Sequence, residues 1–292
     1  MAEITREQLI LSLVGVSEKA NLAGVDLSYQ DLSKLNLEKA NLSKSYLCDA
    51  CLSATNLIGA NLSNANLCNA FLRDANLSNA NLNEANLINA NLSNANLSNA
   101  NLNNASLSGV NLSGAKFSGA NLSGNNLQDS DLSNAELNDA NISDTVLSNA
   151  NLSGANLSNA NLNNADLSDA NLSGANLSGA NLSGANLSGT NLSGTNLNNA
   201  DLYNAKLIES NLEKVDLSEA KLYNADLSIS NLSGANLKEA ILYNANLQKA
   251  NLSEPNLDHA DFRGADLRNA NLNVASRAGT KFKGALGKGL LW

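Results

Sequence analysis

The sequence predicts an all-β solenoid, a fold in which one short path of the chain repeats and the repeats stack on one another. Three observations predict it. A large apolar residue, nearly always leucine, returns every fifth residue from Leu22 to Leu272 without a break in phase. A small residue, most often alanine, stands two residues before it. A residue type that tolerates a left-handed backbone usually stands two residues after it.

The apolar position defines the coil. There are 51 such positions, all leucine except Phe117, Ile142 and Phe262, and 36 of the 51 residues two places earlier are alanine. On an α-helix, a step of five residues rotates the side-chain direction by about 140° beyond a full turn. The leucines would therefore reach every face of the helix. On a straight strand, alternate leucines would point to opposite sides. The leucines can share one interior only if the chain turns a corner in every five residues, and four corners close one coil.

The corner follows each leucine. The second residue after it is glycine, asparagine or aspartate at 36 of 51 positions. These types accept a positive φ, which a type II turn requires at its third residue. Other residue types occupy this position mainly toward the two ends of the chain, and there we expect type I or irregular turns: Tyr29, Lys34, Lys39, Ala54, Glu209, Lys214 and Ile229.

The repeats A(N/D)LSX, as in "ANLSN" at 75–79 and "ADLSD" at 165–169, resemble those of the pentapeptide-repeat family. The resemblance covers residues 20–274. It implies a right-handed quadrilateral β-helix with twenty residues per coil, hence about 13 coils. It also implies that the leucine and alanine positions point inward and the other three outward. Family members are most numerous in cyanobacteria, and many have no assigned role.

Both ends of the repeat region should be capped, because an open coil is an exposed sheet edge. Residues 1–19 predict a short N-terminal capping helix, in which Thr5 and Gln8 have the spacing of a capping box. Residues 275–292 predict a C-terminal cap or contact segment. Its apolar residues make a homodimer through this segment an open alternative: Leu286, Leu290, Leu291 and Trp292.

The surface offers little chemistry. Cys48 and Cys68 share a column of residues twenty apart, and Cys51 follows Cys48 at CxxC spacing. Zinc needs four ligands, and the only histidine, His259, is far away along the chain. We therefore interpret the cysteines as small residues that stack. With no base to activate a serine and no loop to build a cleft, the sequence predicts no enzyme, no metal and no cofactor.

One column differs from the rest. Tyr203, Tyr223 and Tyr243 occupy the same outward position on three successive coils, and Arg263 and Lys283 continue it, flanked by Lys221 and Ile241. Two interpretations are open. The column is a ladder that stiffens the coil by cross-strand contacts, or it is a strip that binds a protein partner.

The composition favours a non-enzymatic scaffold with a protein partner that the sequence does not identify. The net charge is −9, and residues 170–200 carry no charge at all. No segment has the length of a membrane span, and we expect neither a membrane nor direct nucleic-acid contact. The start of the chain lacks a signal peptide and the cysteine count is odd, so we expect a cytoplasmic location.

The residues argue against two other functions. Some pentapeptide-repeat proteins protect DNA gyrase from quinolones by resembling acidic duplex DNA, so a DNA mimic that binds gyrase is the alternative function. The dilute and scattered acidic residues do not favour it. Ice binding would need outward threonine rows, but four threonines occupy the inward alanine position: Thr55, Thr145, Thr190 and Thr195.

Overall fold

The computed structural model describes residues 20–273 and 276–287 and divides into two compact units, 1–141 and 142–292. The predicted capping helix at 1–19 lies outside the described residues, as do Leu290, Leu291 and Trp292 of the predicted contact segment. The described residues contain no helix, which agrees with the all-β prediction.

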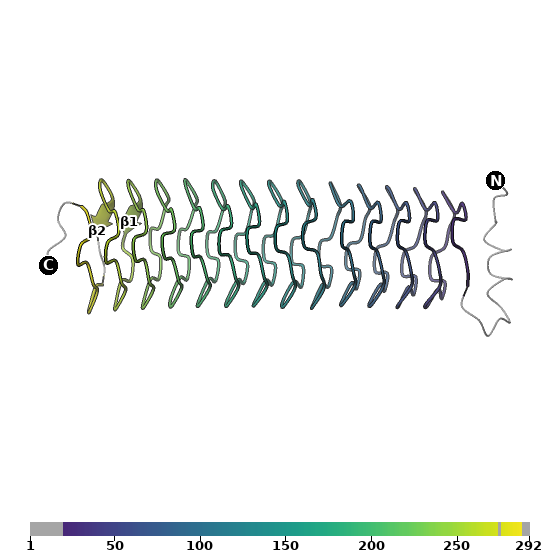
Figure 1. Cartoon of the computed structure of the whole chain (residues 1–292), viewed down its shortest axis with the longest axis horizontal. Helices are drawn as coiled ribbons and strands as arrows, with labels where there is room; N and C mark the ends of the chain where they lie inside the picture. Colours follow the sequence, from purple (N-terminus) through teal and green to yellow (C-terminus); the bar gives the residue numbers. More distant parts are fainter. Residues whose placement is uncertain (1–19, 274–275, 288–292) are drawn as a thin grey trace. The chain divides into compact units, whose positions relative to one another are not determined.

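Both units are built from the same coil, which takes twenty residues to return to its starting point (Figure 1). In the first unit Asn41 pairs in parallel with Asn61, and in the second Asn191 pairs with Asn211. Each coil has four short paired positions separated by four two-residue turns. The predicted period of twenty residues, with one corner in every five, is therefore confirmed.

Most paired positions are single residues, so only two segments of the described chain are long enough to be named strands. These are β1 (Asn251–Ser253) and β2 (Asn271–Asn273), which lie side by side in Figure 1. They pair in parallel, with Leu252 opposite Leu272. Each is one side of a coil, and their register shows the same twenty-residue step.

The corners lie where the sequence predicts them. The N–H of Ala40 donates to the carbonyl of Leu37 over 3.0 Å, which closes a four-residue turn after the leucine. The third residue of that turn, Lys39, has a φ of 57°. Gly179 and Asn159 occupy the same place in the second unit, with φ values of 67° and 56°. The positive φ is the one that a type II turn requires.

The expectation of type I or irregular turns at the exceptional positions is wrong. All seven residues keep a positive φ, between 54° and 63°: Tyr29, Lys34, Lys39, Ala54, Glu209, Lys214 and Ile229. The reason is the contact between coils. The N–H of Ile229, for example, donates to the carbonyl of Gln248 on the next coil over 2.9 Å. An irregular turn would lose that bond, so the stacked neighbours impose the turn even on a β-branched residue.

The interior consists of the leucine and alanine positions. In the first unit Leu92 and Ala95 are fully buried, and in the second Leu182 and Ala185 are. Leu272 is the exception among the predicted inward leucines and is half-buried. Threonines at the alanine position form hydrogen bonds in the interior. The Thr190 hydroxyl, for example, donates to the Leu167 carbonyl of the preceding coil over 2.8 Å.

The residue before each leucine has a role that the sequence reasoning missed. The Oδ1 of Asn41 accepts a bond from the N–H of Ser43 at 3.2 Å, and its Nδ2 donates to Asn21 Oδ1 on the neighbouring coil at 3.1 Å. One carboxamide thus holds its own turn and links two coils. In the second unit such bonds join a continuous ladder: Asn151, Asn171, Asn191, Asn211, Asn231, Asn251 and Asn271.

Candidate functional site

The tyrosine column lies on one side of successive coils in the second unit. Its register follows from the residues two places before each member. Asp201 pairs with Lys221, which pairs with Ile241, which pairs with Asp261. The three tyrosines therefore occupy equivalent positions one coil apart.

The backbone holds the column in place. The carbonyl of Tyr223 accepts a bond from the N–H of Asn204 at 3.0 Å, and that of Tyr243 accepts one from Asn224 at 3.0 Å. Tyr203 is 46% exposed and Tyr243 is 41% exposed, whereas Tyr223 between them is half-buried. In the described part of the chain the stacked ring pair is Phe262 with Phe282, and no ring contact joins the three tyrosines to one another.

Arg263 follows Tyr243 in the column and is held by two partners. Its guanidinium forms an ion pair with Asp261 at 2.6 Å, and its Cζ lies 5.9 Å from the centre of the Tyr243 ring. That distance is within the range of a cation–π contact. The hydrogen bond from Arg263 holds the pKa of the Asp261 carboxyl below its usual value. The Arg263 guanidinium therefore lies one coil after the last tyrosine of the column and is held in a defined orientation.

The same arginine arrangement occurs a second time without the tyrosines. Arg268 pairs with Asp266 at 2.6 Å, on the adjoining side of the same coil. Here too the arginine lowers the pKa of the carboxyl. The residues one and two coils earlier in the Arg268 column are Gln248 and Ser228, so Arg268 is a natural control for Arg263.

The interpretation of Cys48 and Cys68 as merely stacked small residues is wrong. The two form a disulfide between neighbouring coils of the first unit, with Cα atoms 4.7 Å apart. The coil period places them in direct register, which is the signal that could have predicted the bond. Cys51 is a free thiol and half-buried. The CxxC spacing of Cys48 and Cys51 therefore does not correspond to a bonded pair.

The structure brings no metal ligands together among the residues it describes. His259 lies at a turn, where its N–H donates to the carbonyl of Ala278 over 2.7 Å. Within the same residues, no helix has the length and apolar character needed to cross a membrane.

Two family models match the chain. The model described as pentapeptide repeats matches eight times, at residues 20–57, 55–94, 85–124, 185–222, 195–234, 220–254, 230–269 and 250–286. The model described as a pentapeptide repeat region matches residues 126–197. Together they cover well over half of the chain. No curated protein matches it.

Several solved structures are similar. HetL, described as a pentapeptide repeat protein involved in heterocyst differentiation regulation from Nostoc sp. strain PCC 7120, is 25% identical, with 97% of this chain and 95% of HetL covered and a TM-score of 0.24. Rfr23 from Cyanothece 51142 is 38% identical over 32% of this chain and 60% of its own, with a TM-score of 0.27. QnrB1, a plasmid-mediated fluoroquinolone resistance protein, is 20% identical over 73% of this chain and 90% of its own, with a TM-score of 0.29.

Proposed function

Because this chain belongs to the pentapeptide-repeat family, we propose that it is a non-enzymatic scaffold that binds a protein partner through its tyrosine column. The contact surface consists of Tyr203, Tyr223, Tyr243 and Arg263. The matching family models describe repeats and no catalytic domain. In this proposal the repeats form a regular backbone, and the residues that differ from the usual repeat, the tyrosines and Arg263, bind the partner.

One observation carries this proposal: three tyrosines, two exposed and the middle one half-buried, repeat at a single position and end at an oriented arginine. Tyrosine and arginine are the residue types enriched at the centres of protein interfaces. Three of the five tyrosines of the chain stand in this column. No ring contact joins the three tyrosines to one another, so the exposed parts of Tyr203 and Tyr243 that Arg263 does not cover are available to a partner.

The test is capture of partners by the full chain and by a variant in which Tyr203, Tyr223 and Tyr243 are all replaced by serine. We expect the variant to lose a partner that the parent chain retains, with an unchanged circular dichroism spectrum. Tyr46→Ser in the first unit is the control for loss of an exposed ring, since Tyr46 is 46% exposed. A partner held equally well by the triple variant would contradict the proposal.

The two arginines sharpen this test. Arg263→Ala and Arg268→Ala remove ion pairs of the same 2.6 Å length to an aspartate two residues earlier. Arg263→Ala also removes the contact with the Tyr243 ring, so its effect on folding should be at least as large as that of Arg268→Ala. Only Arg263→Ala should weaken partner binding, by about tenfold if the arginine contributes about 1.4 kcal/mol. Equal weakening by both variants would indicate a structural role and not a recognition role.

The finer features of the fold are also part of the proposal. We propose that the coil is right-handed, that the repeats form about 13 coils and that a helix in residues 1–19 caps them. A crystal structure tests all three. A cytoplasmic location, where thiols are kept reduced, requires Cys48 and Cys68 to be reduced in the cell. Alkylation of the thiols in a fresh cell extract tests this.

A further inference from the structure

The side of the coil that carries the tyrosine column, here called the tyrosine face, becomes cationic beyond Arg263. Lys281 pairs in parallel with Asp261, and the carbonyl of Lys283 accepts a bond from the N–H of Gly264 at 3.2 Å. Lys281 and Lys283 therefore occupy the two outward positions of this face one coil after Asp261 and Arg263. Both lysine side chains are exposed.

The two lysines differ from Arg263 because no ion pair neutralises them. Asp261 is only 7% exposed, and its two oxygens accept bonds from the Arg263 guanidinium at 2.6 to 3.0 Å. Arg263, and more weakly Lys281, lowers the pKa of the Asp261 carboxyl. Neither Lys281 nor Lys283 forms an ion pair within the part of the chain that the structure describes. The face thus ends in a neutral pair followed by two positive charges.

The acidic residues nearby do not cancel these charges. Asp258, on the preceding side of the coil, accepts bonds from the Ser276 hydroxyl at 2.6 Å and the Ala278 N–H at 2.7 Å. Asp266, on the following side, pairs with Arg268 at 2.6 Å. The other carboxylates on the tyrosine face or at its border lie at least two coils before the lysines: Asp201, Glu219 and Glu239.

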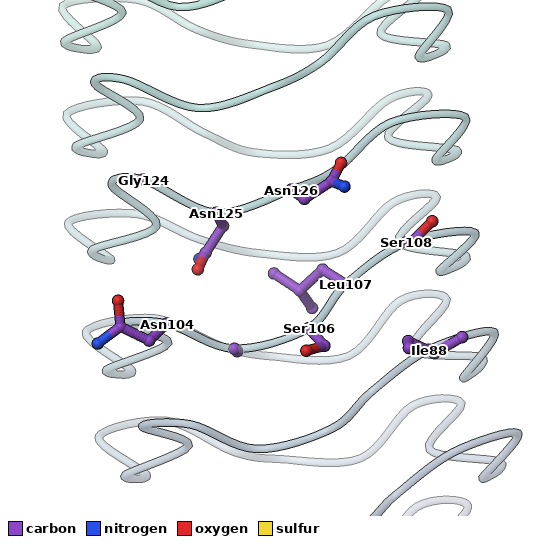
Figure 2. Close-up of a pocket in the computed structure, with 9 residues that line it drawn as sticks. Ile88, Asn104, Ser106, Leu107, Ser108, Gly124, Asn125 and Asn126 are labelled. Atoms are coloured by element: carbon purple, nitrogen blue, oxygen red, sulfur yellow. The ribbon is translucent and has the colours of Figure 1, made fainter.

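Positive charge is scarce in the rest of the chain. The net charge is −9, and between residues 74 and 205 the only cation is Lys116, which pairs with Glu136 at 3.5 Å. A hollow of about 410 Å³ between coils of the first unit, shown in Figure 2, is lined by uncharged residues such as Asn104, Ser106 and Ser108. A negatively charged partner is therefore attracted to the end of the tyrosine face and not to this hollow.

Apolar surface lies beside the lysines on the same face. Tyr243 is 41% exposed, and Ile241, which pairs with Asp261, is half-buried. From Tyr243 to Lys283 the face advances by two coils, which is about 10 Å at the usual spacing of paired strands. An extended peptide covers that distance in about three residues. One short segment can therefore reach both the tyrosine ring and the lysines.

We propose that this end of the tyrosine face binds an acidic peptide segment of the protein partner, in which carboxylates stand about three residues from an apolar or aromatic side chain. The inference rests on the proposed function, because it specifies the chemistry of the partner at the same site. Lys281 and Lys283 attract the carboxylates, and Tyr243 and Ile241 pack against the apolar side chain. Exposed charges of this kind speed association and exclude partners of the wrong sign.

A nucleic acid is the other kind of partner that lysines attract. Its binding depends on many phosphate contacts, whereas this face ends in two unpaired lysines on a chain with a net charge of −9. The acidic remainder of the chain would repel a long polyanion more than a short segment. The observations therefore favour a peptide, and an oligonucleotide serves as one arm of the test.

The experiment selects binders of the full chain from a displayed library of random short peptides. Relative to the starting library, we expect enrichment of aspartate and glutamate about three residues from an apolar or aromatic residue. The double variant Lys281→Gln, Lys283→Gln should lose this acidic enrichment and bind the strongest acidic peptide at least about tenfold more weakly. Added salt should weaken binding by the parent chain more than binding by the double variant.

A matched control is the double variant Lys206→Gln, Lys249→Gln. Both lysines are exposed, and both belong to the side of the coil that follows the tyrosine face. This variant loses the same total charge, so it should change the affinity by less than about twofold if position decides the effect. Equal weakening by the two double variants would show an effect of net charge alone and overturn the proposal.

The triple variant with serine at Tyr203, Tyr223 and Tyr243 separates this inference from the proposed function. Selected peptides without acidic bias that the triple variant no longer binds would overturn the acidic partner and leave the tyrosine column as a binding surface. Acidic peptides bound equally by the triple variant, or displaced equally well by oligothymidylate of the same charge, would overturn the inference. A selection that enriches no peptide would contradict both.

Discussion

At the scale of single residues, the fold constrains the backbone more strictly than the side chain. Tyr29 and Ile229 adopt φ values of 62° and 63° at the turn position, although nothing in their chemistry favours a left-handed backbone. The sequence predicts where the turn lies but not that every turn keeps one conformation. That uniformity comes from hydrogen bonds to the next coil. Such bonds cannot be predicted from the conformational preferences of the residues in the turn.

Ile229 is therefore the clearest site for stabilisation. We expect Ile229→Asn to raise the free energy of unfolding by about 1 kcal/mol, because asparagine tolerates the left-handed region and a β-branched residue does not. Ile208→Asn is the control, since Ile208 is an isoleucine of the same unit without a positive φ. Chemical denaturation of both variants measures the difference. Equal effects of the two changes would contradict the explanation by backbone strain.

At the scale of the coil, neighbours are joined by side chains as well as by backbone. The Cys48–Cys68 disulfide and the Asn151–Asn271 ladder both depend on a step of twenty residues. The column position of the cysteines was evident in the sequence, but whether two cysteines bond depends on spacing that only the structure gives. The asparagine ladder was missed because each carboxamide bonds in two directions, one local and one between coils.

The disulfide closes a segment with a sequence separation of 20. Replacing Cys48 and Cys68 together by serine should lower the free energy of unfolding by about 3 kcal/mol, as expected for a loop of that length. Reduction of the parent chain should have a similar effect, whereas Cys51→Ser should have little. Thermal unfolding with and without a reductant measures this. A parent chain that unfolds identically when reduced would contradict a stabilising bond.

The ion pair of Asp261 with Arg263 makes stability depend on pH. Because the pKa of Asp261 is lowered below 3.8 in the folded chain, its stabilisation is complete at neutral pH and is lost as the pH falls through the lowered value. We expect Asp261→Asn to be less stable than the parent at neutral pH, with a difference that shrinks in acid. Asp201→Asn, at the same position without an arginine two residues later, is the control. A constant difference down to about pH 3 would contradict this account.

At the scale of the whole molecule, charge argues against DNA mimicry. Duplex DNA carries one charge per about 1.7 Å, whereas this chain has a net charge of −9 over 292 residues and none between 170 and 200. We expect no inhibition of gyrase supercoiling and no protection from quinolones at micromolar protein, with a fluoroquinolone resistance protein as positive control. Inhibition comparable to that control would establish the alternative function.

The twenty-residue coil also has an evolutionary consequence. Each coil bonds only to the coils before and after it, so a duplication or deletion of twenty residues within a regular stretch leaves every remaining coil with an equivalent neighbour. A change of five residues between Tyr203 and Tyr223 would instead rotate all later columns by one side of the coil and separate the two tyrosines. The uniform stretch at 170–195 can thus vary in length by whole coils during evolution, while the column of tyrosines can be inherited only as a block.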